Sequence, residues 1–111
     1  MQMDNMQETA NSVSELMKSL SNPKRLLILC QLTEGERSVS ELARLTAMRE
    51  PAVSQQLALL RKDGIVNARR DGQNMLYALD RPDIRRLIEF LYATYCEPHC
   101  AEGGALPAKA S

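Results

Sequence analysis

A single change of pattern limits this chain to few folds: the helical spacing of apolar residues stops at Asp63-Gly64, and strand-like segments follow. Before this point, apolar residues recur three and four positions apart, which is typical of amphipathic helices. Beyond it, residues 65–68 and 75–79 suit short strands, and Asp71-Gly72-Gln73-Asn74 between them has the residue types of a turn. The sequence therefore predicts several helices followed by one β-hairpin.

Start and stop signals divide the helical part of the chain. Asn22-Pro23 separates a helix over about residues 6–20 from a second over about 23–33, because Asn caps a helix and Pro suits its first turn. A capping box, Ser38 with Glu41, opens a short third helix, and a fourth covers about residues 50–62. After the hairpin, we expect Asp80 to cap a last long helix that reaches Tyr95.

The order of these segments indicates one architecture. Two short helices joined by a tight turn form a helix-turn-helix, and a basic hairpin directly after the second makes a winged helix. We expect a mainly α fold with a small β-hairpin, in which residues 1–96 form one DNA-binding and dimerisation domain. Proline and glycine residues further on predict a flexible C-terminal tail over 97–111. The alternative is a small helical adaptor with an unrelated hairpin.

Composition and charge exclude some classes of protein. The chain has 111 residues with 14 basic and 14 acidic side chains, so it is not a polycation that coats nucleic acid. An unevenly charged DNA-binding domain is compatible with these counts. The longest apolar run, Leu26–Cys30, is too short to cross a bilayer, which needs about 20 residues. The N-terminal residues lack a signal-peptide pattern, so we expect a cytoplasmic protein with no membrane partner.

The candidate DNA-contacting side chains lie on the fourth helix and on the hairpin. The second helix of a helix-turn-helix lies in the major groove, where glutamine can pair with adenine and arginine with phosphate or guanine. Arginine in a wing enters the minor groove or binds phosphate, and adjacent arginines on a strand point to opposite faces, so we expect one of a pair to face DNA. The alternative for all of these side chains is a solvated surface. They are Arg49, Ser54, Gln55, Gln56, Arg69, Arg70, Gln73 and Asn74.

The first and last helices carry apolar stripes wider than one small core requires. One winged helix contacts few phosphates, whereas two copies on two half-sites contact more. We therefore expect a homodimer, joined through these two helices, on double-stranded operator DNA.

Three cysteines, Cys30, Cys96 and Cys100, leave several kinds of chemistry open. An odd number without a secretion signal does not indicate a disulfide framework, so reduced thiols, a redox switch and metal ligands all remain. Cys30 lies on the apolar second helix, where a cysteine can also be a small core residue. Cys96, His99 and Cys100 could together bind a soft metal ion.

The sequence lacks the motifs of an enzyme. It has no Cys-x-x-Cys redox motif, no glycine-rich phosphate loop and no Ser/His/Asp set. We therefore expect neither catalysis nor a bound cofactor.

Two stretches resemble the ArsR/SmtB family of bacterial winged-helix repressors. Residues 20–26, Leu-Ser-Asn-Pro-Lys-Arg-Leu, are similar to the junction between that family's first two helices, and residues 54–66 are similar to its recognition helix and the entry to the wing. The similarity spans about residues 12–96 and implies a repressor that binds operator DNA. Arg49-Glu50-Pro51 departs from the serine-containing cap of the family, so we expect base readout to differ.

Residues 29–39 and 91–96 are further similar to the thiol-sensing branch of this family, typified by BigR, SqrR and HlyU. This resemblance implies that Cys30 and Cys96 are a redox-sensing pair. In that branch a small-molecule inducer, which is a persulfide, a polysulfide or a peroxide-type oxidant, oxidises the pair within one subunit, and the repressor then leaves its operator; we expect the same here, with a reactive sulfur species as the inducer. The alternatives are a peroxide or general thiol-oxidation sensor, and a metal- or arsenite-responsive repressor that uses Cys96, His99 and Cys100. His99 and Cys100 lie beyond the family's usual cysteine.

Overall fold

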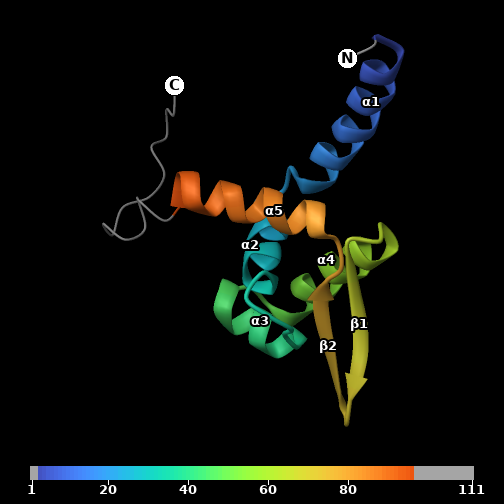
Figure 1. Ribbon diagram of the computed structural model, residues 1–111. Helices are drawn as coiled ribbons and strands as arrows, with labels where there is room; N and C mark the ends of the chain where they lie inside the picture. Colours follow the sequence, from blue (N-terminus) through green and yellow to red (C-terminus); the bar gives the residue numbers. More distant parts are fainter. Residues whose placement is uncertain (1–2, 97–111) are drawn as a thin grey trace.

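The computed structural model of the chain describes residues 3–96, and Figure 1 shows that these form a helical body with a projecting hairpin. In chain order the elements are α1 (Met3–Leu20), α2 (Pro23–Leu32), α3 (Val39–Thr46), α4 (Glu50–Lys62), β1 (Val66–Asp71), β2 (Asn74–Leu79), α5 (Pro82–Leu91) and the π-helix η1 (Tyr92–Cys96). The predicted winged helix-turn-helix is confirmed, with α3 and α4 as the helix-turn-helix and the hairpin as the wing. The expected tail, residues 97–111, lies outside the described residues. Within residues 3–96, no helix is long and apolar enough to span a membrane.

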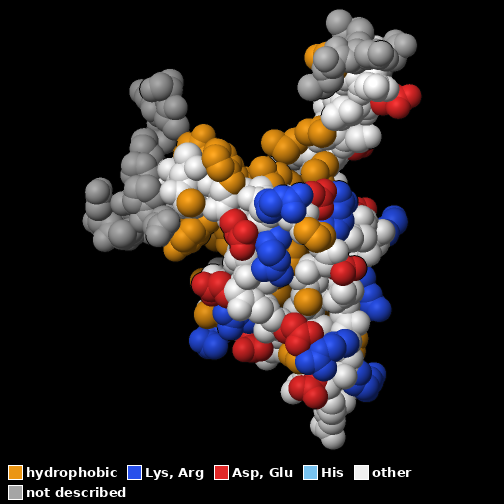
Figure 2. Space-filling view, in the orientation of Figure 1, with side chains coloured by type: hydrophobic (Ala, Val, Ile, Leu, Met, Phe, Trp, Pro, Cys, Tyr) orange, Lys and Arg blue, Asp and Glu red, His pale blue; other side chains and the backbone are white. Residues whose placement is uncertain are grey.

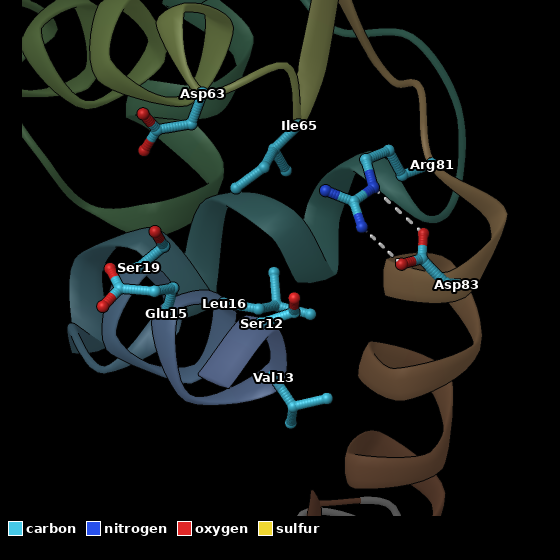
Figure 3. A pocket seen from close by; sticks show the side chains of 9 residues that line it. All are labelled: Ser12, Val13, Glu15, Leu16, Ser19, Asp63, Ile65, Arg81 and Asp83. Carbon is cyan, nitrogen blue, oxygen red and sulfur yellow. Dashed lines mark hydrogen bonds and ion pairs between the residues drawn. The ribbon is translucent and has the colours of Figure 1, made fainter. Parts of the chain in front are cut away.

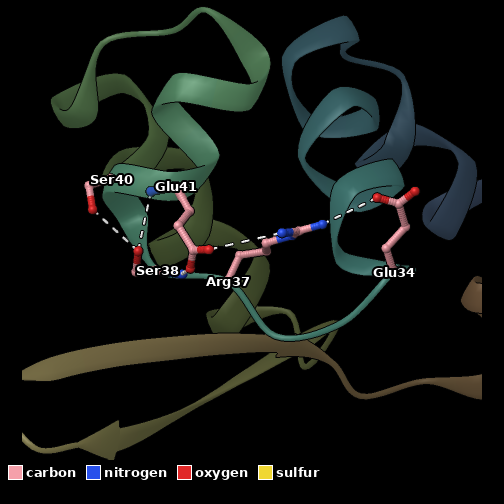
Figure 4. A network of polar contacts seen from close by, with 5 residues as sticks. All are labelled: Glu34, Arg37, Ser38, Ser40 and Glu41. Atoms are coloured by element: carbon pink, nitrogen blue, oxygen red, sulfur yellow. Dashed lines mark hydrogen bonds and ion pairs between the residues drawn. The ribbon is translucent and has the colours of Figure 1, made fainter.

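Local hydrogen bonds explain where α2 and α3 begin. Asn22 Oδ1 accepts a hydrogen bond from the Lys24 backbone N–H at 2.8 Å, and Pro23 occupies the first turn of α2. At α3 the predicted capping box is present: the Glu41 N–H donates to Ser38 Oγ at 3.2 Å, and the Ser38 N–H donates to Glu41 Oε1 at 3.0 Å (Figure 4).

The predicted cap of α5 is wrong by one residue. Arg81, not Asp80, is the N-cap, and its side chain makes no capping hydrogen bond. The Asp80 N–H instead donates to the Ile65 carbonyl oxygen at 3.1 Å, which ties the chain after β2 to the start of β1. This contact between distant residues holds Asp80 in the link, so the helix begins after it. Arg81 pairs with Asp83 in the first turn, Nη2 to Oδ2 at 2.5 Å.

The last helix also ends differently from the prediction. Regular α-helix stops at Leu91, and a π-helical turn over Tyr92–Cys96 carries the chain to the second cysteine. Single π-turns of this kind are frequent at functional sites.

The core is formed where α2, α3 and α4 pack together under α5 and the base of the wing. Its members are apolar, and no polar or charged residue is buried among the described residues. Burial of this many aliphatic side chains, at about 25 cal/mol per Å² of apolar surface, is the main force that fixes the helices around one another. The buried residues are Leu20, Ile28, Leu29, Leu32, Leu42, Ala43, Val53, Leu57, Leu60, Ile65, Val66, Leu79, Ile84 and Ile88.

The wing is an antiparallel hairpin with a tight turn. Val66 lies opposite Leu79, and the turn between the strands contains Gly72 at a φ of 67°, a conformation that glycine adopts without strain. The segment between α2 and α3 joins the edge of β2, because Arg37 and Tyr77 exchange two backbone hydrogen bonds of 3.0 and 2.8 Å. The wing is therefore attached to the body at its middle as well as at its base.

The N-terminal part of α1 projects away from the body (Figure 1). Near its other end, Leu20 is buried and Leu16 packs against the core. An open cavity of about 570 Å³ lies between α1, the α4–β1 connection and the start of α5, as Figure 3 shows. Its lining residues are Ser12, Val13, Glu15, Leu16, Ser19, Asp63, Ile65, Arg81 and Asp83.

Candidate DNA interface and thiol site

The buried side chains of α4 decide which of its residues face outward. Val53 and Leu57 are fully buried one turn apart, so the helix cannot rotate without exposing them. Ser54 and Gln55 are consequently exposed, as is Arg49 at the entry to the helix. These three residues lie where the sequence pattern predicted them.

Gln56 lies differently from its neighbours. It is partly buried, and its Oε1 accepts a hydrogen bond from Arg25 Nε of α2 at 2.8 Å. Arg25 also donates from Nη1 to the Ser19 carbonyl oxygen at 2.7 Å, so one guanidinium joins α1, α2 and α4. The sequence pattern did not reveal this contact, because it connects residues 31 positions apart.

Because Arg69 and Arg70 are adjacent on β1, their side chains project to opposite faces of the strand. Arg69 forms a bidentate ion pair with Glu36, with Nε to Oε2 at 2.6 Å and Nη2 to Oε1 at 2.7 Å. This hydrogen-bonded contact lowers the pKa of the Glu36 carboxyl and raises that of Arg69. Arg70 is exposed and forms no ion pair within residues 3–96. The contact of Glu36 with Arg69 could not be predicted from the sequence, since only the fold brings Glu36 to β1.

The tip of the wing meets the start of the helix-turn-helix. An open cleft of about 200 Å³ is lined by Gln73 and Asn74 of the wing, by Glu50 of α4 and by Ser38 and Ser40 at the start of α3, with Val39 and Met75 completing the lining. The structure thus brings the candidate residues of the wing tip close to the N-terminal end of α4. Glu50, the first residue of α4, also lines this cleft and brings a carboxylate to it. Glu50 belongs to the Arg49-Glu50-Pro51 segment, in which the sequence departs from the serine-containing cap of the ArsR/SmtB family.

A polar network fixes the segment that leads into α3 (Figure 4). Arg37 pairs with Glu34, Nη2 to Oε1 at 3.2 Å, and approaches Glu41, Nη1 to Oε2 at 3.9 Å. The hydrogen bond from the Ser38 backbone N–H is the main cause of a lowered Glu41 pKa. The start of α3 is therefore held by both a capping box and a charged neighbour.

Cys30 and Cys96 line the same cavity. Cys30 comes from α2 and Cys96 from the end of η1, and no disulfide joins the two. The cavity has a volume of about 210 Å³, and its other lining residues are apolar or tyrosine: Leu26, Ile88, Leu91, Tyr92 and Tyr95. The fold thus brings together two thiols, at positions 30 and 96, that lie far apart in the chain.

The surroundings of Cys30 favour the protonated thiol. Its side chain is half-buried, and this burial raises the pKa of the thiol. The end of its helix is tied to α5, because Thr33 Oγ1 donates to the Cys30 carbonyl oxygen at 2.6 Å and Arg85 Nη1 donates to the Thr33 carbonyl oxygen at 2.7 Å. These hydrogen bonds anchor the helix end that carries the thiol to α5.

The candidate metal cluster lies mostly beyond residue 96. His99 and Cys100 lie outside the described residues, so only Cys96 of that set has a place in the structure. Among residues 3–96, no group of three or more His, Cys, Asp or Glu side chains is arranged to hold a metal ion.

Comparison with known proteins identifies relatives of the whole described fold. The model of bacterial regulatory proteins of the arsR family matches residues 22–68. A biofilm growth-associated repressor from Agrobacterium fabrum is 44% identical over 93 residues, which cover 84% of this chain and 80% of that protein. The structure of reduced HlyU from Vibrio cholerae matches with a TM-score of 0.80 and 37% identity, covering 86% of this chain and 100% of that one.

A third relative bears on assembly. It is a homodimeric winged helix-turn-helix DNA-binding domain from Mycobacterium bovis, described as a possible ArsR-family transcriptional regulator. It matches with a TM-score of 0.68 and 33% identity, over 84% of this chain and 86% of that one. With this degree of similarity along most of its length, the chain belongs to the arsR family of DNA-binding transcriptional regulators and is not an enzyme.

Proposed function

We propose that this ArsR-family regulator is a homodimeric repressor that binds double-stranded operator DNA while Cys30 and Cys96 are reduced, and releases it when a reactive sulfur species oxidises the pair. The observation that carries the proposal is the shared cavity of about 210 Å³, to which α2 contributes Cys30 and η1 contributes Cys96. Two thiols that line one small cavity are suited to a short sulfur bridge. One structural relative is described as reduced HlyU, which names a redox state of that protein.

On the DNA side, we place α4 in the major groove and the wing beside it. Exposed polar side chains at the start of α4 contact base edges and phosphate, and those of the wing contact phosphate and the minor groove. Arg69 is paired with Glu36 and is left out of this set. Gln56 is left out as well, because its partly buried side chain is bonded to Arg25. The proposed contact residues are therefore Arg49, Ser54, Gln55, Arg70, Gln73 and Asn74.

The redox step is a sulfur transfer from an organic persulfide, RSSH. One cysteine thiol takes up the outer sulfur and becomes a protein persulfide, and RSH leaves. The other cysteine attacks the inner, protein-bound sulfur, which forms the Cys30–Cys96 disulfide and expels H₂S. Two thiols and one RSSH thus give one disulfide, RSH and H₂S. Each further RSSH can insert one sulfur into the bridge and leave as RSH, so a longer bridge is open to the same reaction.

A bridge between α2 and η1 would act on both functional regions. α2 carries Arg25, which contacts Gln56 of α4. η1 continues α5, whose exposed apolar surface we assign to the dimer interface. The bridge therefore links the support of the recognition helix to the element that sets the spacing of the two subunits. Operator release requires only that the reduced and bridged states differ in DNA affinity.

The test combines mass spectrometry with DNA binding. Reduced protein is exposed in parallel to an organic persulfide, glutathione disulfide and hydrogen peroxide, and is mapped as peptides. Binding to a duplex selected from a random-sequence library with the reduced protein is followed by fluorescence anisotropy. We expect the organic persulfide to join Cys30 to Cys96 and to weaken DNA binding by the parent protein. The Cys30→Ser and Cys96→Ser variants should stay bound to DNA in the presence of the persulfide. Cys100→Ser is the matched control and should respond like the parent protein.

Each other outcome would replace the proposal. Loss of two hydrogens with peroxide, and release of DNA, would make the protein a general thiol-oxidation sensor. An unmodified Cys30 under all three reagents would rule out the dithiol switch. DNA release by arsenite or a soft metal ion, abolished in Cys100→Ser, would favour the metal-responsive alternative.

A further inference from the structure

We propose that Glu36 is a positioning residue of the wing: its carboxylate pairs with the Arg69 guanidinium in the way that a DNA phosphate would, so that Arg70 is the only arginine of the hairpin that contacts the DNA backbone. The inference concerns the DNA-binding activity of the family and is independent of the thiol switch. It rests on the bidentate contact between Glu36 and Arg69, with distances of 2.6 and 2.7 Å.

The backbone holds Glu36 in place for this contact. The next residue, Arg37, is bonded through its backbone N–H and carbonyl oxygen to Tyr77 of β2, at 3.0 and 2.8 Å. β2 in turn pairs with β1, where Arg69 lies opposite Leu76. The carboxylate and the guanidinium are therefore carried by the two segments that pair with β2. Little backbone freedom is lost when they pair, unlike in an ion pair between two separate flexible segments.

The geometry of the contact makes it a substitute for phosphate. Arginine presents parallel N–H donors that match two oxygens of a carboxylate or a phosphate, and Glu36 engages two nitrogens of Arg69 in this way. The Arg69 side chain is 56% exposed and that of Glu36 is 36% exposed, so the pair is open to a competing anion. Arg70 points to the other face and pairs with no acidic residue in the described part of the chain. One arginine is thereby occupied and its neighbour is available.

The pairing of Arg69 with Glu36 would limit the affinity of the protein for DNA of unrelated sequence. Phosphate contacts supply most non-specific affinity for DNA, and each contact adds about 0.9 to the slope of log affinity against log salt concentration. If Glu36 keeps Arg69 from the backbone, its removal recruits one more phosphate contact per wing. A dimer would then gain about 1.8 in this slope, together with higher affinity for unrelated DNA.

The test measures salt dependence with reduced, full-length protein and a short duplex of mixed sequence. Glu36→Gln should bind more tightly at low salt and steepen the slope by about 0.9 per wing. Arg69→Gln alone should leave the slope of the parent protein unchanged, and Glu36→Gln with Arg69→Gln should return the slope to the parent value. An unchanged slope in Glu36→Gln, or a flatter one in Arg69→Gln, would overturn the proposal.

Asp71→Asn is the matched control for net charge. Asp71 lies on the same strand as Arg69 and acts on it only through its charge, with no hydrogen bond or ion pair between them. Removal of this carboxylate should raise affinity slightly without adding a phosphate contact, so the slope should stay as in the parent protein. A slope change as large as that of Glu36→Gln would mean that general charge, not the Arg69 contact, governs the effect. If Glu36→Gln does not fold, the slope of Arg69→Gln decides alone.

Discussion

Burial of the Cys30 side chain makes its chemistry dependent on pH. Because burial raises the pKa of this thiol, less of the nucleophilic thiolate is present at neutral pH than in an exposed cysteine. In a Cys96→Ser, Cys100→Ser background, alkylation of Cys30 by iodoacetamide should speed up as pH rises, with a midpoint above that of the urea-unfolded chain. The measurement is the rate from intact mass at stepped pH.

The same raised pKa has a consequence for stability. A group whose pKa is higher in the folded state contributes stability fully below its unfolded pKa and loses it as pH rises through the folded pKa. The free energy of unfolding should therefore decline on the alkaline side, and Cys30→Ala should remove that part of the decline. Equal alkaline slopes in the parent protein and in Cys30→Ala would contradict the assignment of the shift to this thiol.

Two adjacent glutamines of α4 should differ in what their removal costs. Gln56→Ala leaves the partly buried Arg25 without a side-chain partner, so unfolding free energy should fall by about 1 kcal/mol. Gln55 is exposed, so Gln55→Ala should stay within about 0.5 kcal/mol of the parent protein while weakening binding to the selected duplex. Urea unfolding and fluorescence anisotropy measure the two effects. Identical stability of the two variants would show that the Arg25 contact contributes nothing.

At the scale of elements, the turn between α3 and α4 carries backbone strain. Ala47 ends α3 in the left-handed conformation, at a φ of 56°, and it is the only non-glycine residue with positive φ within residues 3–96. This conformation costs a residue with a Cβ roughly 1 kcal/mol, and glycine adopts it freely. Ala47→Gly should therefore raise the unfolding free energy by about 0.5 kcal/mol or more, after the entropy that glycine adds to the unfolded chain.

Ala58→Gly is the matched control for this substitution. Ala58 is exposed in the interior of α4, where glycine costs about 1 kcal/mol relative to alanine. The two variants make the same chemical change and should move the urea midpoint in opposite directions. Destabilisation by both would mean that the strain at Ala47 is relieved elsewhere in the turn.

The elements that local sequence determines were the ones predicted correctly. α4 begins and ends where expected, because Pro51 and Gly64 mark its two ends. The start of α5 was missed, because a backbone bond from Asp80 to Ile65 overrides the local capping preference. The π-turn that carries Cys96 was also missed, since its apolar spacing resembles that of a helix. Residue pairs such as Glu36 with Arg69 depend on tertiary structure and have no local pattern.

At the scale of the whole molecule, most of the exposed large apolar side chains lie on α1, α5 and η1. Figure 2 shows hydrophobic side chains gathered where α1 meets α5, whereas charged side chains cover the helix-turn-helix and the wing. The exposed residues include Val13 and Met17 of α1 and Phe90 of α5, with Met17 51% and Phe90 61% exposed. Large apolar side chains exposed together indicate an interaction surface. A second copy of the chain is the occupant that the homodimeric relative supports.

Met17→Glu tests this surface. In a dimer joined through α1 and α5, the new carboxylate would be buried without a partner, which costs about 3 kcal/mol or roughly a hundredfold in the dimer dissociation constant. Sedimentation velocity should show a monomer at concentrations where the parent protein is a dimer. Binding to a duplex with two half-sites should weaken, because a monomer occupies one half-site and loses the second set of phosphate contacts.

Leu45→Glu provides the comparison. Leu45 is also a large apolar residue with an exposed side chain, of which 37% is accessible. It lies on α3, away from the proposed dimer surface. The Leu45→Glu substitution should leave the sedimentation coefficient unchanged, since glutamate at this position remains in contact with water. If Leu45→Glu dissociates the protein and Met17→Glu does not, the subunits meet through the helix-turn-helix. In that case α5 would not connect Cys96 to the subunit spacing, and the thiol bridge would have to act on DNA binding through α2 and Arg25 alone.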